Sequence, residues 1–292
     1  SCTVNNCSVE NAQQFVIEAI CANQAGFSVT NNTMTHNING SFFDFRGASE
    51  LLISDNIVTG CQSSSEPPFA VAARVSPLTA TITNNTITHN NCGAFLFNLT
   101  NTDLAQVTVS QNIITDNASG ARDNLGSAIV FDKNATLLGN CRLSMTDNTI
   151  SGNGRNGLYF HIDGSYKNLQ VQATGNTMTS NGKGGLSCNA PCQTFTLAAT
   201  NNSITQGGDH GISVTTQDPA VITTADITIT NNIITGNVGG GNGIALAHKG
   251  TTVTFVATNN ILSNNEGTGI LAYCQDPGIQ NFTVDIKNNT IA

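Results

Sequence analysis

One seven-residue string recurs along the whole chain and constrains the fold more than any other feature. Its clearest copy, Asn-Asn-Thr-Ile-Thr-His-Asn, covers residues 84–90. Related copies follow one another about 28 residues apart, a period that is typical of solenoid proteins. The second Asn of each copy falls at Asn6, Asn32, Asn56, Asn85, Asn112, Asn148, Asn176, Asn202, Asn232, Asn260 and Asn289. We therefore expect the chain to wind into stacked coils.

Apolar residues within each repeat alternate with polar ones. Two of them stand five and three residues before the second Asn, as Ile227 and Ile229 do before Asn232, and another follows two residues after it. A further apolar segment follows a glycine, as at residues 243–246. A period of two predicts strands with one buried face. Three short strands per repeat predict an all-β, right-handed parallel β-helix of about ten to eleven coils, with residues 1–292 forming a single domain.

The asparagine column has a physical explanation. Strands in neighbouring coils lie about 4.8 Å apart, so an Asn at the same corner of every coil stacks on the next one. Its amide can donate to one neighbour and accept from the other, and the Asn backbone tolerates the left-handed conformation that a corner needs. We expect these side chains to point inward, because a continuous ladder satisfies every buried amide.

The motifs resemble those of a known superfamily. Asn-Asn-x-Ile-x-x-Asn followed by Gly-Ile is similar to the parallel β-helix repeat of the pectate-lyase-like superfamily, and the resemblance covers residues 1–292. It implies the fold and allows several functions, because that superfamily includes polysaccharide lyases, glycosidases, epimerases, phage tailspikes, autotransporter passengers and surface-layer proteins. A weaker resemblance, to the chlamydial polymorphic outer-membrane family, rests on Phe95 to Asn98 and Gly126 to Ile129.

Composition excludes several classes of function. The chain has 10 Lys and Arg against 18 Asp and Glu, so it lacks the basic surface that nucleic acid requires, and we expect no nucleic-acid partner. It contains no apolar run of about 18 residues, so we expect no membrane-spanning helix.

The nine cysteines suggest an oxidising environment. They lack the spacing of zinc ligands, so we expect neither a metal site nor another cofactor. Disulfide bonds in an extracellular or cell-surface protein are the favoured interpretation, and scattered buried thiols are the alternative. The candidate pairs are Cys188 with Cys192, Cys61 with Cys92, and Cys2 with Cys7.

Residues for catalysis are sparse. A lyase or hydrolase needs clustered carboxylates, often with a cation, on one face. The candidates are Asp44 with Arg46, Asp132 with Lys133, and His161 with Asp163. Solvated charges on a sheet face are the alternative interpretation. His36 and His89 occupy the same place in the motif and are interpreted as structural, solvent-facing residues.

Two classes of function remain open. The favoured one is a non-enzymatic, extracellular structural or adhesive solenoid: a surface-layer, sheath or fibre subunit, or a passenger domain. Its expected partners are further copies, end to end or side by side, or further coils of a longer parent chain, and host or cell-surface glycans are a further candidate. The alternative is a carbohydrate-active lyase, hydrolase or epimerase that acts on an extracellular polysaccharide.

Overall fold

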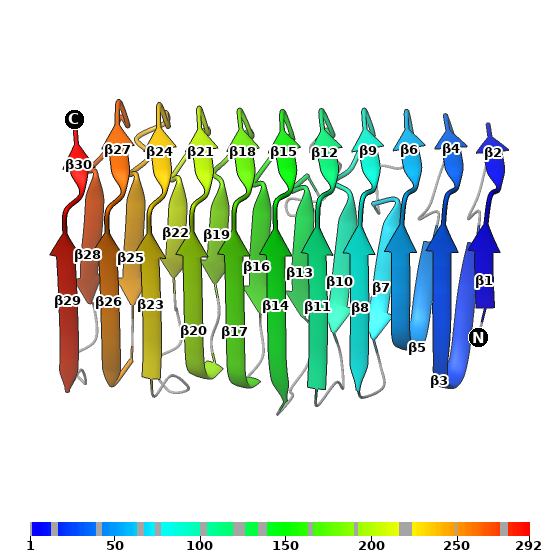
Figure 1. Ribbon diagram of the computed structural model, residues 1–292, viewed down its shortest axis with the longest axis horizontal. Helices are drawn as coiled ribbons and strands as arrows, with labels where there is room; N and C mark the ends of the chain where they lie inside the picture. The colour runs from blue at the N-terminus through cyan, green and yellow to red at the C-terminus, as the bar shows by residue number, and fades with distance from the viewer. Residues whose placement is uncertain are drawn as a thin grey trace.

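In the computed structural model every regular element is a β-strand, and the strands stack into one elongated solenoid (Figure 1). The structure describes residues 2–12, 17–38, 43–62, 67–73, 77–99, 104–118, 126–133, 139–162, 166–189, 192–215, 224–248, 250–274 and 280–292. All paired strands run parallel, in one sheet of 19 strands and one of 11. The expected all-β parallel β-helix is confirmed.

Three sets of strands run along the solenoid. The long-strand row lies in front in Figure 1 and comprises β1 (Cys2–Asn5), β3 (Ile17–Thr30), β5 (Phe43–Ser54), β8 (Leu78–Thr83), β11 (Leu104–Ser110), β14 (Asn140–Thr146), β17 (Tyr166–Thr174), β20 (Cys192–Thr200), β23 (Thr224–Thr230), β26 (Thr252–Thr258) and β29 (Asn281–Lys287). The short-strand sheet continues from it after a corner and comprises β2 (Ser8–Glu10), β4 (Thr33–Thr35), β6 (Ile57–Thr59), β9 (Thr86–Thr88), β12 (Ile113–Thr115), β15 (Thr149–Ser151), β18 (Thr177–Thr179), β21 (Ser203–Thr205), β24 (Ile233–Thr235), β27 (Ile261–Ser263) and β30 (Thr290–Ile291).

The rear row lies behind the other two and comprises β7 (Phe69–Ala73), β10 (Phe95–Leu99), β13 (Ile129–Lys133), β16 (Leu158–Ile162), β19 (Leu186–Asn189), β22 (Ile212–Thr215), β25 (Ile244–His248) and β28 (Ile270–Cys274). Eleven short strands stack in the described part of the chain, but only eight coils are complete turns with a separate rear strand, so the predicted count of ten to eleven coils is slightly too high. The long and rear rows belong to one sheet because β5 pairs with β8 of the long-strand row and with β7 of the rear row.

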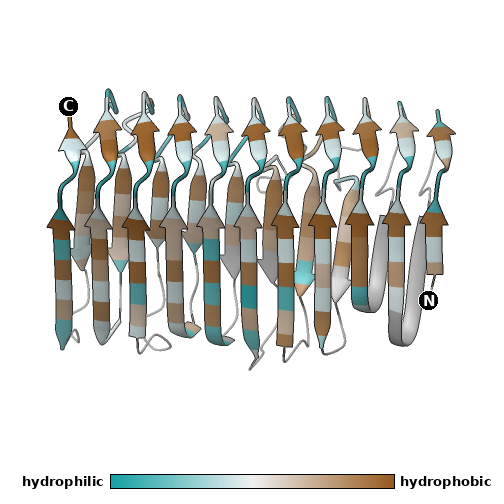
Figure 2. Cartoon of the chain, viewed as in Figure 1, coloured by the Kyte–Doolittle hydropathy of each residue, from teal (hydrophilic) through white to brown (hydrophobic). Residues whose placement is uncertain are grey.

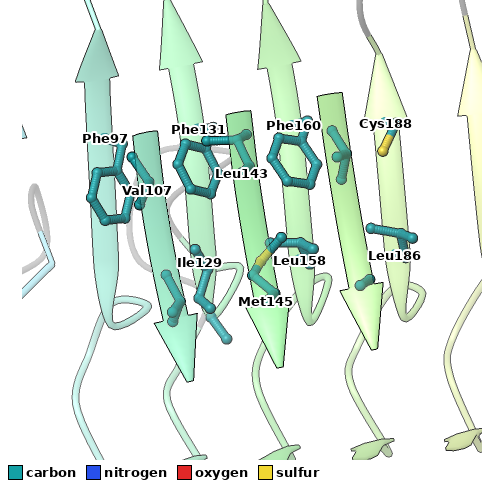
Figure 3. Packing of buried hydrophobic residues seen from close by; sticks show 14 of the residues in the cluster. Phe97, Val107, Ile129, Phe131, Leu143, Met145, Leu158, Phe160, Leu186 and Cys188 are labelled. Carbon is teal, nitrogen blue, oxygen red and sulfur yellow. The ribbon is translucent and has the colours of Figure 1, made fainter. Parts of the chain in front are cut away.

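Apolar and polar residues alternate along many of the strands (Figure 2), and the apolar residues of this alternation are buried. In β11, for example, Ala105, Val107 and Val109 are buried while the residues between them face out. Register aligns like with like, so buried rings stack from coil to coil: the centroids of Phe97 and Phe131 lie 4.6 Å apart, and those of Phe131 and Phe160 lie 4.9 Å apart (Figure 3). The interior is therefore a set of continuous apolar columns.

The predicted asparagine ladder is present and unbroken. Ten buried or partly buried side chains form it: Asn32, Asn56, Asn85, Asn112, Asn148, Asn176, Asn202, Asn232, Asn260 and Asn289. In the first nine, Nδ2 donates to the Oδ1 of the next coil at 2.9–3.0 Å, and Asn289 Nδ2 donates to the carbonyl oxygen of Ala257. Each Oδ1 also accepts a backbone N–H, as Asn148 does from Asn112. The residue before each ladder Asn, rather than the ladder Asn itself, adopts the left-handed conformation, with φ of 54–67°.

The first coil departs from the predicted register. Asn6, and not the preceding Asn5, has the left-handed φ, and the N–H of Cys7 donates to Asn32 Oδ1. Cys7 therefore occupies the ladder position there. The string Asn5-Asn6 resembles the first two residues of the motif, but it lies one residue before the positions that these residues occupy in the other coils.

A second ladder, which the sequence interpretation missed, lies on the other side of each short strand. Its asparagines, five residues after those of the first ladder, are Asn37, Asn90, Asn117, Asn153, Asn181, Asn237 and Asn265. Four side-chain bonds of 2.7–3.0 Å join neighbours in this ladder. Cys61 and Gly207 interrupt it, and their backbone N–H groups donate to Asn90 and Asn237. The last Asn of the seven-residue motif is the sequence feature that could have predicted this second ladder.

Candidate functional site

The rear row brings together four of the polar residues that could act in chemistry. Register places Asp132 beside Asn98 on one side and beside His161 on the other, and His161 lies beside Asn189. Neighbouring strands are about 4.8 Å apart, so these four residues form one line across β10, β13, β16 and β19. Register therefore brings an acidic residue beside a histidine, and these are residue types that can exchange a proton with a substrate.

The other predicted catalytic residues do not lie next to Asp132 and His161 in this line. Arg46 belongs to the line but is separated from Asn98 by Ala72, which places it about 14 Å from Asp132. Asp44 pairs with Ala70 and so lies in a different line. Asp163 lies outside the described residues, and Lys133 is opposite Ile162.

Two amide oxygens in this line are shielded from solvent. The Oδ1 atoms of Asn98 and Asn189 are buried and have no hydrogen-bond partner among the residues that the structure describes. An unpaired buried acceptor is costly, so each one is a place where a donor such as a hydroxyl group would be stabilised. Asn189 could not be selected from the sequence, because the loops between coils differ in length and hide which residues become neighbours.

The described residues form neither a metal-binding cluster nor a membrane-spanning helix. Among the residues that the structure describes, no three His, Cys, Asp or Glu side chains gather closely enough to hold a metal ion. The same residues include no helix long and apolar enough to cross a membrane.

The outward face of the short-strand sheet is the most regular surface of the molecule. From β4 to β27 both outward positions of every strand hold Thr, Ser or Ile, and no charged residue occurs among them. Four isoleucines on this face, Ile57, Ile113, Ile233 and Ile261, are 45–48% exposed. Neighbouring hydroxyls bond to one another in places, as Thr88 does to Thr59 at 3.2 Å. We call this surface the Thr/Ile face.

Comparison with protein families agrees with this architecture. A family model described as right handed beta helix region matches residues 1–141 and 137–291. The chain belongs to the right-handed β-helix family. Neither the curated proteins nor the solved structures gave a match.

None of the three predicted disulfides is present among the described residues. Cys2, Cys7, Cys61, Cys188, Cys192 and Cys274 are free thiols. The three predicted disulfides are therefore wrong.

Register explains why the predicted pairs do not form. Cys61 lies opposite Asn90, so Cys92 is two residues out of register with it. Four residues separate Cys2 from Cys7, and the extended strand Cys2–Asn5 carries the chain too far from Cys2 for a disulfide. Cys188 points into the core between Phe160 and Val214, while Cys192 begins the next strand.

The two histidines of the motif belong to a corner of the β-helix. His36 and His89 both have left-handed φ, near 52° and 57°, immediately before the second-ladder positions. His89 Nε2 lies 3.9 Å from Asp116 Oδ2, and both side chains are exposed. They occupy equivalent corners on the surface, as the motif predicts.

Proposed function

We propose that the protein is a non-enzymatic, extracellular or cell-surface solenoid with a structural or adhesive role, and that it associates with copies of itself. A surface-layer, sheath or fibre subunit and a passenger domain are the forms that such a role takes. The observation that carries this proposal is the Thr/Ile face, because it is long, uncharged and partly apolar.

Physical chemistry favours a partner on that face. Thr and Ile are stiff at χ1, so the face loses little side-chain entropy when it is covered. Charges on exposed sheets normally oppose contact between molecules, and the Thr/Ile face has none from β4 to β27. A second copy offers the same spacing, so its side chains can interdigitate along the whole length.

The extracellular location is part of the proposal and no longer rests on disulfides. It rests on a surface rich in Thr, Ser and Asn with only 10% charged residues. Protease treatment of intact source cells tests it: we expect the protein to be digested without lysis, and complete protection would contradict this location.

Self-association is tested by substituting the face. Ile113→Lys with Ile233→Lys places two charges on the Thr/Ile face, and we expect the sedimentation coefficient and particle size to fall to those of a monomer. Leu52→Lys is the matched control, because Leu52 is 38% exposed in the long-strand row. An unchanged assembly in the double variant, or a monomeric unsubstituted protein at high concentration, would contradict lateral association.

A second candidate function is a carbohydrate-active lyase, hydrolase or epimerase. The specific observation in its favour is that Asp132 is in register with His161, and that this pair lies between Asn98 and Asn189, whose buried Oδ1 atoms have no partner among the described residues. Asp132 and His161 would transfer protons, while Asn98 and Asn189 would hold sugar hydroxyls.

Turnover separates the two candidates. We expect no unsaturated or reducing ends after incubation with a panel of neutral and acidic polysaccharides. Release of such ends that is lost in both Asp132→Asn and His161→Asn would favour the enzyme over the structural role.

A further inference from the structure

A polar groove crosses four strands of the long-strand row, away from both the Thr/Ile face and the rear-row line. It has a volume of about 330 Å³ and crosses β11, β14, β17 and β20. Its exposed or half-buried lining consists of Leu104, Gln106, Asn140, Arg142, Asn168, Gln170, Thr194 and Thr196.

Arg142 lies in the middle of this groove as an unneutralised cation. Its side chain is exposed and forms no ion pair or hydrogen bond with the residues that the structure describes. Register places Gln106 on one side of it and Gln170 on the other. An arginine fork without a partner is suited to bind a carboxylate through two parallel N–H···O bonds.

Amide groups surround that cation. Asn140 and Asn168 lie two residues earlier on β14 and β17, and Asn168 Nδ2 donates to Asn140 Oδ1 at 2.6 Å. Primary amides both donate and accept, which is the combination that a ring of sugar hydroxyls requires. Arg142 with these four amides therefore offers one charged contact and several neutral polar ones.

Acidic residues lie on the same sheet face beyond both ends of the groove. Along the register line, Glu50 is three strands before Arg142 and Asp226 is three strands after it. At about 4.8 Å per strand, each lies about 14 Å away, and both are exposed. A ligand with a carboxylate on every unit would bring charge of the same sign toward both acids, and the net charge of -8 adds to that repulsion.

We propose that this groove binds an oligosaccharide that carries a single carboxylate flanked by neutral sugars, with the carboxylate on Arg142 and hydroxyls on the surrounding amides. The site goes beyond the proposed structural role and does not depend on self-association. It gives the solenoid an adhesive specificity for sparsely acidic glycans over neutral and over uniformly acidic ones.

Calorimetric titration with three probes tests the specificity. The probes are a tetrasaccharide with one internal uronate, the same tetrasaccharide after reduction of its carboxyl to a primary alcohol, and a homopolymer of uronic acid. A charge-assisted bidentate contact supports about tenfold tighter binding of the first probe than of the second. We expect the homopolymer to bind more weakly per site than the first probe.

Matched variants assign the effect to Arg142. Arg142→Gln should remove the preference for the carboxylate, and Arg142→Lys should retain only part of it, since a point charge lacks the fork. Lys183→Gln removes one exposed positive charge elsewhere and should leave binding unchanged. Equal affinity for the first two probes, no binding of the first probe, or unchanged binding by Arg142→Gln with an unchanged melting temperature would overturn the proposal. Loss of self-association would not affect it.

Discussion

The two asparagine ladders flank the same short strands and use the same residue, yet only one of them is continuous. The first ladder runs from Asn32 to Asn289 without a gap, whereas the second is interrupted at Cys61 and Gly207. At each gap the backbone N–H still donates to the Oδ1 of the next asparagine, so only the side-chain bond to that oxygen is lost. The fold therefore tolerates a missing side chain where the backbone keeps one bond, and the two ladders need not carry equal energy.

The largest effect is expected from a break in the continuous ladder. Asn148→Leu would remove two bonds that Nδ2 donates and two that Oδ1 accepts, which we expect to cost about 3 kcal/mol of unfolding free energy. Asn37→Leu is the matched comparison beside the Cys61 gap, since Asn37 is equally buried but makes only two side-chain bonds. Chemical denaturation measures both variants, and equal losses would contradict the difference between the ladders.

Lowering the pH changes the stability of the core without acting on the ladders, because asparagine side chains do not ionise. Burial lowers the pKa of His248 from 6.5 to about 4. The unfolded chain binds a proton at this histidine below about pH 6.5, whereas the folded chain does so only near pH 4, so folding stability falls as the pH falls between these values. We expect a loss of about 3 kcal/mol between pH 7 and pH 4 from this group. Unfolding curves should show that His248→Gln lacks this part of the pH dependence.

The Gly207 gap should resist repair. A Cβ at this position would lie 2.7 Å from Asn237 Oδ1 and 2.9 Å from the carbonyl oxygen of Lys183. Gly207→Asn should therefore destabilise the protein by about 2 kcal/mol even though it supplies the missing amide. A higher melting temperature for this variant would show that the coil can shift to accept the side chain.

The Cys61 gap should accept repair. Cys61 already holds a buried side chain at the ladder position, and its N–H donates to Asn90 as a ladder residue does. Cys61→Asn should join Asn37 to Asn90 and raise the unfolding free energy by about 1 kcal/mol. Thermal unfolding measures the change, with Cys61→Ser as the control that lacks an amide.

Thiol labelling gives the smallest effect and distinguishes two cysteines at ladder positions. Burial raises the pKa of Cys61 to about 12, whereas Cys7 in the first coil is exposed. Without reductant, a disulfide-exchange reagent should label Cys7 rapidly and Cys61 only after denaturation. Mass spectrometry of the labelled peptides identifies each site, and an unreactive Cys7 would indicate that it is covered or oxidised.

The sequence specified the repeated parts well and the variable parts poorly. The Asn and Ile columns were readable because each coil repeats them at a constant offset, and this predicted the first ladder, the strands and the inward face. The register error at Asn6 arose where that coil replaces the ladder Asn by Cys7. The line from Asn98 to Asn189 and the groove around Arg142 depend on which residues of different coils become neighbours. Loops of unequal length separate those coils, so no fixed spacing in the sequence reveals them.

The unbroken ladder also restricts the lengths that the solenoid can have. Its length is fixed in whole steps of about 4.8 Å, since a coil can be added or lost only if Asn still meets Asn across the junction. Duplicating the segment from Asn176 to Asn201 would move everything beyond it by one step without changing any facing pair. A partner that binds across several coils would then find its contact sites separated by a whole number of these steps.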